Sequence, residues 1–470
     1  MKVSFRITLT FKEEKMRKFS LFFAFLMIIS FVLFLTVCDN GSTSGGGNVL
    51  QIAEEAFTFG LPLVLVDITR RQLDAEGEMN QFLHDTVLPD HTFREFVRPN
   101  VDTLYSNAFL DLSGGPILLS LPDMDNRYHL MQLMDAYTNV FGSPGTRTTD
   151  GNTSREFLIA GPGWTSSADY RSPTNYVWIL GRTLVNSGED VKNVVVPIME
   201  TYTLTRHPSS GPLAKEDGPV ISMINDANEV VAGMPIDVFF NYLNHLMVIN
   251  PPSSADHNNG IVRRMAGIGV GPGATFNLAH FSAEEQAAML SIPQKVMADL
   301  IRRGQYEREF LPVLETGWSS TMANGMGNYG TNYPFRAFIA LTGIGANLPL
   351  DAVYFSVAGL DGSQRYVLRF PSGETPPVVA FWSLTLYAGD YLSENTLRRY
   401  AVGDRSGLAA NEDGSIDIYI QHTNFGIESG KMNNWLPAPG GNFNLTLRAY
   451  IPKEDLLNGS WRMPQITTVE

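Results

Sequence analysis

The sequence predicts a mainly β fold of the α+β class, with two domains that resemble β-sandwiches or jelly rolls and a helical region between them. Three observations support this prediction. Short apolar runs separated by turn residues fill 95–205, apolar residues recur at helical spacing between about 225 and 345, and apolar and polar residues alternate from 347 onward. The length of 470 residues also suits two domains with a connecting region.

Composition indicates a globular body that does not bind nucleic acid. The chain is 44% hydrophobic and only 17% charged, so it can bury a large core. Its net charge is −14, and because residues 1–37 hold six basic and two acidic side chains, the remainder carries −18. A body this acidic repels phosphate backbones.

The N-terminus predicts export and attachment to a membrane. An uncharged apolar run, Leu21–Val37, follows Arg17 and Lys18, which is typical of a signal peptide, with an uncleaved membrane anchor as the alternative. The run precedes Cys38, the only cysteine, and then a polar Gly/Ser-rich stretch. This arrangement resembles a bacterial lipoprotein signal, although Val37 stands where that signal normally has a small residue. We therefore expect a signal peptide at 1–37, a lipid on Cys38, a flexible tether at 38–48, and a body in the cell envelope that faces the periplasm or the exterior.

The first domain, expected at 49–225, begins with a short helix. Leu50, Ala53, Ala56 and Phe57 have helical spacing, and Gly60-Leu61-Pro62 is expected to end the helix. The apolar runs that follow predict strands at 117–121, 128–134, 157–160 and 176–180.

A helical region is expected at 226–346 and a second β domain at 347–470. Ser282 and Glu285 have the spacing of a capping box, and the helical pattern after them continues to Gly304. In the last domain, Asp361-Gly362 and Asp413-Gly414 predict tight hairpins. The alternation at 378–387, 416–421 and 443–448 predicts strands with one apolar and one polar face.

Several motifs together resemble a bacterial family that pairs two domains of unknown function, DUF1254 followed by DUF1214. The motifs are Arg98–Ser106, Met134–Asn139 and Gly161–Trp164 in the first half, and Trp382–Tyr387, Asp413–Ser415, Asn434–Pro439 and Trp461–Pro464 in the second. The resemblance covers about 53–465. It implies two β-sandwich-like domains joined by a helical region, and it supplies no reaction.

Two acids of the first domain, Asp102 and Asp135, are the candidate catalytic residues. If the two strands bring them together, the pair could act as general acid and base or bind a divalent cation through oxygen ligands. The alternative is a buried network of acids and arginines. The other candidate binding residues of this domain are arginines, amides and tyrosines: Arg98, Asn100, Tyr105, Tyr137, Asn139 and Arg147.

Two further segments carry side chains that suit a ligand. Tyr329, Tyr333 and Arg336 lie in a loop rich in Tyr and Asn, a composition suited to sugar or aromatic ligands, and the more ordinary alternative is a packed interdomain loop. Polar strand faces of the last domain could bind glycans or could simply face solvent: Ser383, Thr385, Tyr387, Asp417, Tyr419, Gln421, Thr446 and Arg448.

The sequence lacks a Gly-x-Ser-x-Gly elbow, a Walker loop, a His-Glu-x-x-His motif and a cysteine pair. The leading hypothesis is an envelope-anchored protein that binds a small polar or aromatic molecule or a glycan in a cleft between the first domain and the helical region. One version of it adds turnover, with Asp102 and Asp135 as acid and base. The alternative is a non-catalytic adhesive or scaffold lipoprotein.

Overall fold

The computed structural model describes residues 46–74, 78–94, 97–149, 153–211, 226–320, 322 and 325–469. The expected signal peptide and Cys38 lie outside the described residues, as does most of the expected tether. The residues from Asn48 onward form one unit, and the α+β class with a helical middle region is confirmed.

The first half of the chain forms two packed antiparallel sheets. Sheet I has the order β1 (Leu83–His84), β2 (Thr103–Asp111), β8 (Tyr176–Leu184), β4 (His129–Asp135) and β5 (Val140–Gly142). Sheet II has the order β7 (Tyr170–Arg171), β6 (Arg155–Ala160), β3 (Ile117–Leu121) and β9 (Thr203–Arg206), with β7 parallel to β6. One apolar core joins the sheets, with Leu104, Ile117 and Ile179 among its fully buried members. The four strands expected from the apolar runs are therefore confirmed.

Helix α2 (Gly46–Asp74) is 29 residues long and continues through Gly60-Leu61-Pro62, so the expectation of a short helix is wrong. The reason is burial: residues 59–68 are all buried, and tertiary packing offsets the hydrogen bond lost at Pro62. A Cβ at Gly60 would lie 2.3 Å from Cδ2 of Leu243, so the glycine lets α2 approach α6 closely. By length and composition α2 could cross a membrane, but a buried core helix meets the same criteria and most of α2 is buried.

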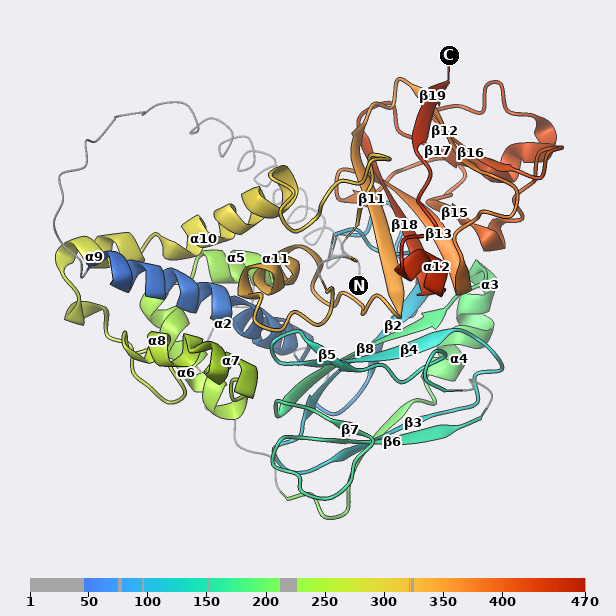
Figure 1. Cartoon of the computed structure of the whole chain (residues 1–470). Helices are drawn as coiled ribbons and strands as arrows, with labels where there is room; N and C mark the ends of the chain where they lie inside the picture. Colours follow the sequence, from blue (N-terminus) through green and yellow to red (C-terminus); the bar gives the residue numbers. More distant parts are fainter. Residues whose placement is uncertain are drawn as a thin grey trace, which may run out of the picture. The chain divides into compact units, whose positions relative to one another are not determined.

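The middle region packs helices around α2 (Figure 1). They are α5 (Ala227–Ala232), α6 (Ile236–Ile249), α7 (Ser254–Asn259), α8 (Ile261–Ala266), α9 (Ala283–Met289), α10 (Ile292–Ile301) and α11 (Tyr333–Gly343). The predicted capping box is present at the start of α9, where Ser282 and Glu285 bond each other's backbone N–H groups. Helix α2, although first in sequence, thus shares its core with the helical region.

The last part of the chain forms a second sandwich. Sheet III has the order β10 (Ser319–Ser320), β11 (Ala352–Leu360), β18 (Phe443–Pro452), β13 (Val378–Ala388) and β14 (Tyr391–Leu392), and β15 (Ala401–Gly403) also pairs with β13. Sheet IV has the order β17 (Trp435–Pro437), β16 (Ile416–Gln421), β12 (Arg365–Phe370) and β19 (Ile466–Val469). Neither Asp361-Gly362 nor Asp413-Gly414 forms the expected hairpin, because β11 and β12, like β15 and β16, belong to different sheets.

Sheets I and III also pack against each other through their second faces (Figure 1). The Tyr128 ring, just before β4, lies 5.2 Å from that of Phe381 on β13 and 5.5 Å from that of Tyr450 on β18. The four sheets therefore follow one another in the order II, I, III and IV, and sheet III shares the second face of sheet I with helix α2.

Candidate functional site

A buried arginine, Arg336 in the first turns of α11, lies in a cage of aromatic rings. Arg336 is only 2% exposed. Its Cζ lies 5.1 Å from the ring centroid of Tyr333 and 5.4 Å from those of Phe59 and Tyr137. Nε and Nη2 are buried, and neither has a hydrogen-bond partner in the described part of the chain. The rings thus enclose a cation whose donors are largely unused.

Local sequence explains how α11 presents this arginine. Asn332 caps the helix by accepting the N–H of Phe335 (3.3 Å), and Pro334 suits the first turn. The Tyr333 hydroxyl donates to Oδ1 of Asp256 at 3.0 Å, which fixes that ring against Arg336. Burial, and then the charge of Asp256, raise the pKa of Tyr333, so its hydroxyl stays protonated at neutral pH.

Asp135 ends β4 and organises the turn into β5. Its Oδ1 accepts hydrogen bonds from the N–H groups of Tyr137 (2.8 Å) and Asn139 (2.9 Å), and its Oδ2 accepts one from Nδ2 of Asn139 (3.0 Å). Burial raises the pKa of Asp135, and the Asn139 hydrogen bonds and the charge of Arg336 oppose that rise only in part. The turn therefore occupies most of the acceptor capacity of Asp135, and the carboxylate forms no direct ion pair with Arg336 among the described contacts.

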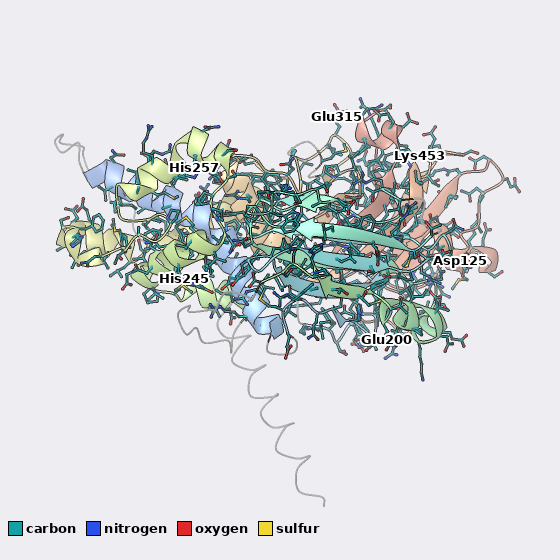
Figure 2. All side chains as sticks on the ribbon, turned by 90° about the horizontal axis from the view of Figure 1, so that it is seen from below. Asp125, Glu200, His245, His257, Glu315 and Lys453 are labelled. Carbon is teal, nitrogen blue, oxygen red and sulfur yellow. The ribbon has the colours of Figure 1, made fainter. Side chains whose placement is uncertain are left out.

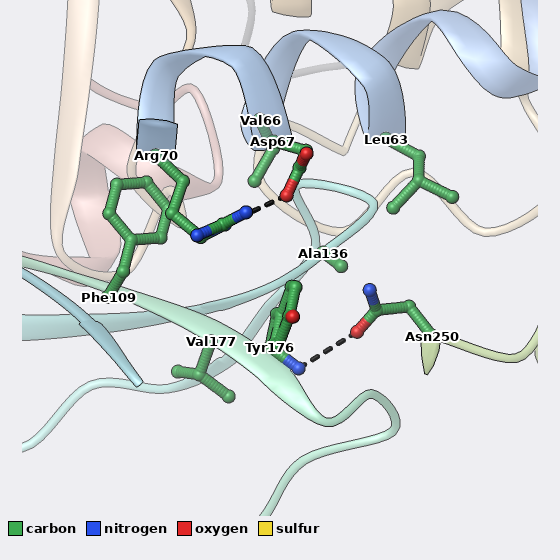
Figure 3. Close-up of a pocket in the computed structure, with 9 residues that line it drawn as sticks. All are labelled: Leu63, Val66, Asp67, Arg70, Phe109, Ala136, Tyr176, Val177 and Asn250. Carbon is green, nitrogen blue, oxygen red and sulfur yellow. Dashed lines mark hydrogen bonds and ion pairs between the residues drawn. The ribbon is translucent and has the colours of Figure 1, made fainter. Parts of the chain in front are cut away.

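A small cavity lies beside the cage, between α2, sheet I and the residue after α6 (Figure 3). Its volume is about 10 Å³, near the lower limit for one water molecule. The Tyr137 hydroxyl donates to the Asn250 carbonyl at 3.0 Å and so connects the cavity to the cage. The lining residues are Leu63, Val66, Asp67, Arg70, Phe109, Ala136, Tyr176, Val177 and Asn250.

Charged and amide groups fix the polar side of this cavity. Nε of Arg70 donates to Oδ1 of Asp67 at 2.8 Å, and the Tyr176 N–H donates to Oδ1 of Asn250 at 2.8 Å (Figure 3). Burial acts to raise the pKa of Asp67, but Arg70, Tyr242 and Arg71 together outweigh it and hold the pKa below its ordinary value. Nδ2 of Asn250 is buried without a partner among the described residues. Cage and cavity therefore both present unused donors.

The structure brings together six of the residues proposed from the sequence. The N–H of Tyr329 donates to Oδ1 of Asn139 at 3.4 Å, which joins the loop before α11 to the β4–β5 turn. The six residues are Asp135, Tyr137, Asn139, Tyr329, Tyr333 and Arg336. This region lies between the first domain and the helical region, where the sequence predicted a ligand.

Asp102 does not join them, and the expectation that the two acids meet is wrong. Strands β2 and β4 flank β8 and are both antiparallel to it, so they run in the same direction. Asp102 precedes the start of β2 and its carbonyl accepts the N–H of Val185, just after β8, whereas Asp135 ends β4 opposite Val177. These two positions are eight residues apart, about 27 Å at the usual rise of a strand. The two carboxylates can share neither a proton transfer nor a metal ion.

Asp102 instead connects the two sandwiches. Its Oδ2 accepts the Ser383 hydroxyl at 2.6 Å, and its Oδ1 accepts Nη2 of Arg405 at 2.7 Å. The residue is 4% exposed. This is the structural ion-pair network that the sequence left open as the alternative.

The remaining candidates of the first domain have other partners. Arg147 bonds Asp351 with Nε and Nη2, at 2.6 and 3.2 Å, and Arg98 lies 3.4 Å from Asp390. Asn100 donates to the Tyr105 hydroxyl at 2.7 Å. These residues therefore do not line the Arg336 cage.

Part of the polar strand face expected to be solvated or adhesive is buried between sheets I and III. Five of its residues are at most 7% exposed: Ser383, Thr385, Tyr387, Thr446 and Arg448. Arg448 donates to the Thr385 and Tyr387 hydroxyls at 2.9 and 2.7 Å. The expectation of an open face is wrong for these five, because the sequence could not reveal that the segment before β2 packs on this face, where Tyr387 donates to the Pro99 carbonyl and Arg448 to the Arg98 carbonyl. Asp417, Tyr419 and Gln421 lie on β16, in sheet IV.

Within the described ranges, no group of three or more His, Cys, Asp or Glu side chains is arranged to hold a metal ion. His245 and His257 lie on separate helices of the middle region, α6 and α7 (Figure 2).

Sequence reasoning missed several charged residues that the fold buries. Asp67, Arg70 and Arg182 are all at most 5% exposed. Arg182 is the only charge in the otherwise apolar strand β8, and that isolated charge is the signal that could have identified it. Asp67 and Arg70 lie close to Arg71 at the end of α2, so no isolated charge marks them.

Comparisons with known proteins agree with the fold. Two family models match, "Protein of unknown function (DUF1254)" at residues 79–206 and "Protein of unknown function (DUF1214)" at residues 356–454. None of the curated proteins matches. The crystal structure of the VPA0106 protein from Vibrio parahaemolyticus aligns with 90% of this chain and 100% of its own, with a TM-score of 0.66 and 22% identity. An uncharacterized protein from Burkholderia cenocepacia aligns over 91% and 96%, with a TM-score of 0.43 and 14% identity. The chain thus carries a DUF1254 region followed by a DUF1214 region, in the order that its motifs predicted.

Proposed function

We propose that the protein binds a small molecule through an oxyanion group, a carboxylate or a phosphate, that docks on Arg336. The observation that carries the proposal is the guanidinium itself, which is 2% exposed and has Nε and Nη2 without partners. A buried charge without hydrogen-bonding partners costs several kcal/mol. An oxyanion would satisfy both donors at once, because its oxygens match the guanidinium geometry.

The surroundings favour an anion over a neutral sugar. Asp135 uses its oxygens within the β4–β5 turn, and the Tyr333 hydroxyl is committed to Asp256. Unused acceptors that could bind sugar hydroxyls are therefore scarce, whereas Arg336 and Nδ2 of Asn250 are both unused donors.

The ligand is small. The adjacent cavity holds about 10 Å³, so a bound group larger than water requires the aromatic side chains to move. Phe59, Tyr137 and Tyr333 supply flat apolar surfaces against which an aliphatic or aromatic body could pack.

A thermal-shift panel on the full-length chain tests the proposal, with inorganic phosphate, acetate and benzoate as probes. We expect at least one probe to raise the melting temperature, and Arg336→Met to abolish that shift. Without ligand, Arg336→Met should be at least as stable as wild type, because an apolar group replaces an unpaired buried charge. Arg264→Met is the matched control, since Arg264 is 40% exposed and bonds Glu55. If Arg336→Met unfolds the protein and no probe shifts the wild type, the arginine has a structural role.

We also propose that the body is held at the envelope by a lipid on Cys38 and faces the periplasm or the exterior. The apolar run Leu21–Val37 followed by this single cysteine supports the proposal. Metabolic labelling with palmitate tests it. Label should enter the wild type and not Cys38→Ala, and equal labelling of both would refute the anchor.

A further inference from the structure

The space between sheets I and III collects arginine and tyrosine side chains from both halves of the chain. Arg182 on β8 lies 5.4 Å from the ring centroid of Tyr105 on β2. Arg448 on β18 lies 5.9 Å from that of Tyr354 on β11. Tyr354 and Tyr450 interact electrostatically with both arginines, so the two guanidinium groups face a common region. We call these two arginines with Tyr128, Tyr354 and Tyr450 the intersheet cluster.

Neither arginine of the intersheet cluster has an acid of its own. Arg182 donates to Oε1 of Gln132 (2.7 Å) and the Gly345 carbonyl (2.9 Å), all neutral acceptors. Arg448 donates to the Thr385 and Tyr387 hydroxyls and to the Arg98 carbonyl, also neutral. Both arginines are at most 6% exposed. Two buried positive charges thus lack a counter-charge among the residues they bond.

The nearby acids are paired with other arginines. Asp102 bonds Arg405 at 2.7 Å, and Asp351 bonds Arg147 at 2.6 Å. Asp404 is one third exposed and lies 4.0 Å from Arg405. Asp102 also interacts electrostatically with Arg448, but the four arginines Arg147, Arg182, Arg405 and Arg448 outnumber these three acids, so a net positive charge remains.

The tyrosines of the cluster offer unused O–H donors. The Tyr128 hydroxyl is buried without a partner among the described residues, and the Tyr450 ring lies 5.5 Å from the Tyr128 ring. The Tyr354 hydroxyl accepts a hydrogen bond from Asn347 and leaves its own proton free to donate. Burial raises the pKa of Tyr128, Tyr354 and Tyr450, so all three remain protonated donors at neutral pH.

We propose that the intersheet cluster binds a second ligand, a small oxyanion that carries two charges, such as a dicarboxylate or a phosphate. Guanidinium and phenol groups supply donors and positive charge, and the ligand supplies the acceptors and the negative charge that the interface lacks. Tyr105 and Tyr354 keep accessible surface although each lies on a strand with a neighbour on both sides. Because the contacts come from both sandwiches, the bound anion holds the two halves of the chain together.

Titration calorimetry of the full-length chain with malonate and with inorganic phosphate tests this inference. The titrations use the Arg336→Met variant, so that binding at the proposed Arg336 site cannot contribute. At least one anion should bind, and the stronger of the two identifies the class. Failure of both anions to bind this variant overturns the inference and leaves the Arg336 proposal untouched.

Tyr128→Phe and Tyr450→Phe then locate the bound anion. Tyr128→Phe removes a hydroxyl that has no partner among the described residues, so this variant should fold with wild-type stability in the absence of anion. Tyr450→Phe removes a second hydroxyl of the same cluster. Each should weaken anion binding by about tenfold, the usual effect of losing one hydrogen bond to a charged group. Tyr202→Phe, which removes a buried hydroxyl bonded to Thr183 on the other face of sheet I, should leave binding unchanged. Unaltered affinity in both cluster variants would place the anion elsewhere and refute the assignment.

Discussion

Replacing Asp102 with asparagine tests whether this acid holds the two sandwiches together. The wild-type carboxylate is 4% exposed and accepts hydrogen bonds from Ser383 and Arg405, both in the second sandwich. Removing one partner of a buried ion pair costs about 3–5 kcal/mol. The Arg405 side chain is 29% exposed and can be partly rehydrated, and asparagine retains a neutral acceptor. We therefore expect Asp102→Asn to lower the free energy of unfolding by about 2–3 kcal/mol.

Urea denaturation followed by tryptophan fluorescence measures this loss. The matched control is Asp390→Asn, which breaks the pair between Arg98 and Asp390, whose side chains are 42% and 55% exposed. Exposed pairs of this kind contribute about 0–1 kcal/mol. A cycle with Arg405→Gln should show that the Asp102 and Arg405 changes are strongly non-additive. If Asp102→Asn is as stable as the control, the proposed role of this acid at the interface is wrong.

Three further predictions concern packing and pH. Gly60→Ala should destabilise the chain by about 1–3 kcal/mol, because the new methyl group would overlap the fully buried Leu243. Gly343→Ala is the control and should be neutral or slightly stabilising, because the space around its Cβ is open. The urea midpoints of the two variants are compared. Burial raises the pKa of Asp404 to about 6, above the unfolded value near 4, so stability should fall as pH rises from about 4 to about 6. One third of that side chain is exposed, so screening reduces the total change to about 1–2 kcal/mol, and Asp404→Asn should remove it in melts across this pH range. Leu243→Ala should reduce stability less in the Gly60→Ala background than in the wild type, because the methyl group added at position 60 fills part of the cavity that the loss of the leucine side chain leaves. Equal losses in the two backgrounds would contradict the packing argument.

The strands could be predicted from the sequence because their signal is local. Alternation along Ile416–Gln421 and Phe443–Arg448 depends only on each strand having one buried face. The pairing of strands is not local, and for this reason the meeting of Asp102 with Asp135 was predicted wrongly. Both acids lie at strand ends, but they lie at opposite ends of β8, which only the register reveals.

Two of the three rings of the Arg336 cage could be predicted in the same local way. The motif around Asp135 and the loop before α11 point to Tyr137 and Tyr333, whereas the sequence around Phe59 does not distinguish it from an ordinary core residue of a helix. The interruption of α2 expected at Pro62 shows the same limit, since burial on nearly all sides overrides a local signal for chain breaking.

The stacking of sheets I and III has a consequence for how this chain can be divided. The two family models cover 79–206 and 356–454 as separate stretches, but a fragment that ended between them would uncover Arg448 and Tyr450 on one piece and Arg182 on the other. Neither piece could then bury the sheet face that packs against the other piece in the intact chain. We therefore expect the two sequence modules to fold as one unit, and truncation at the boundary between them to yield halves that are prone to aggregate.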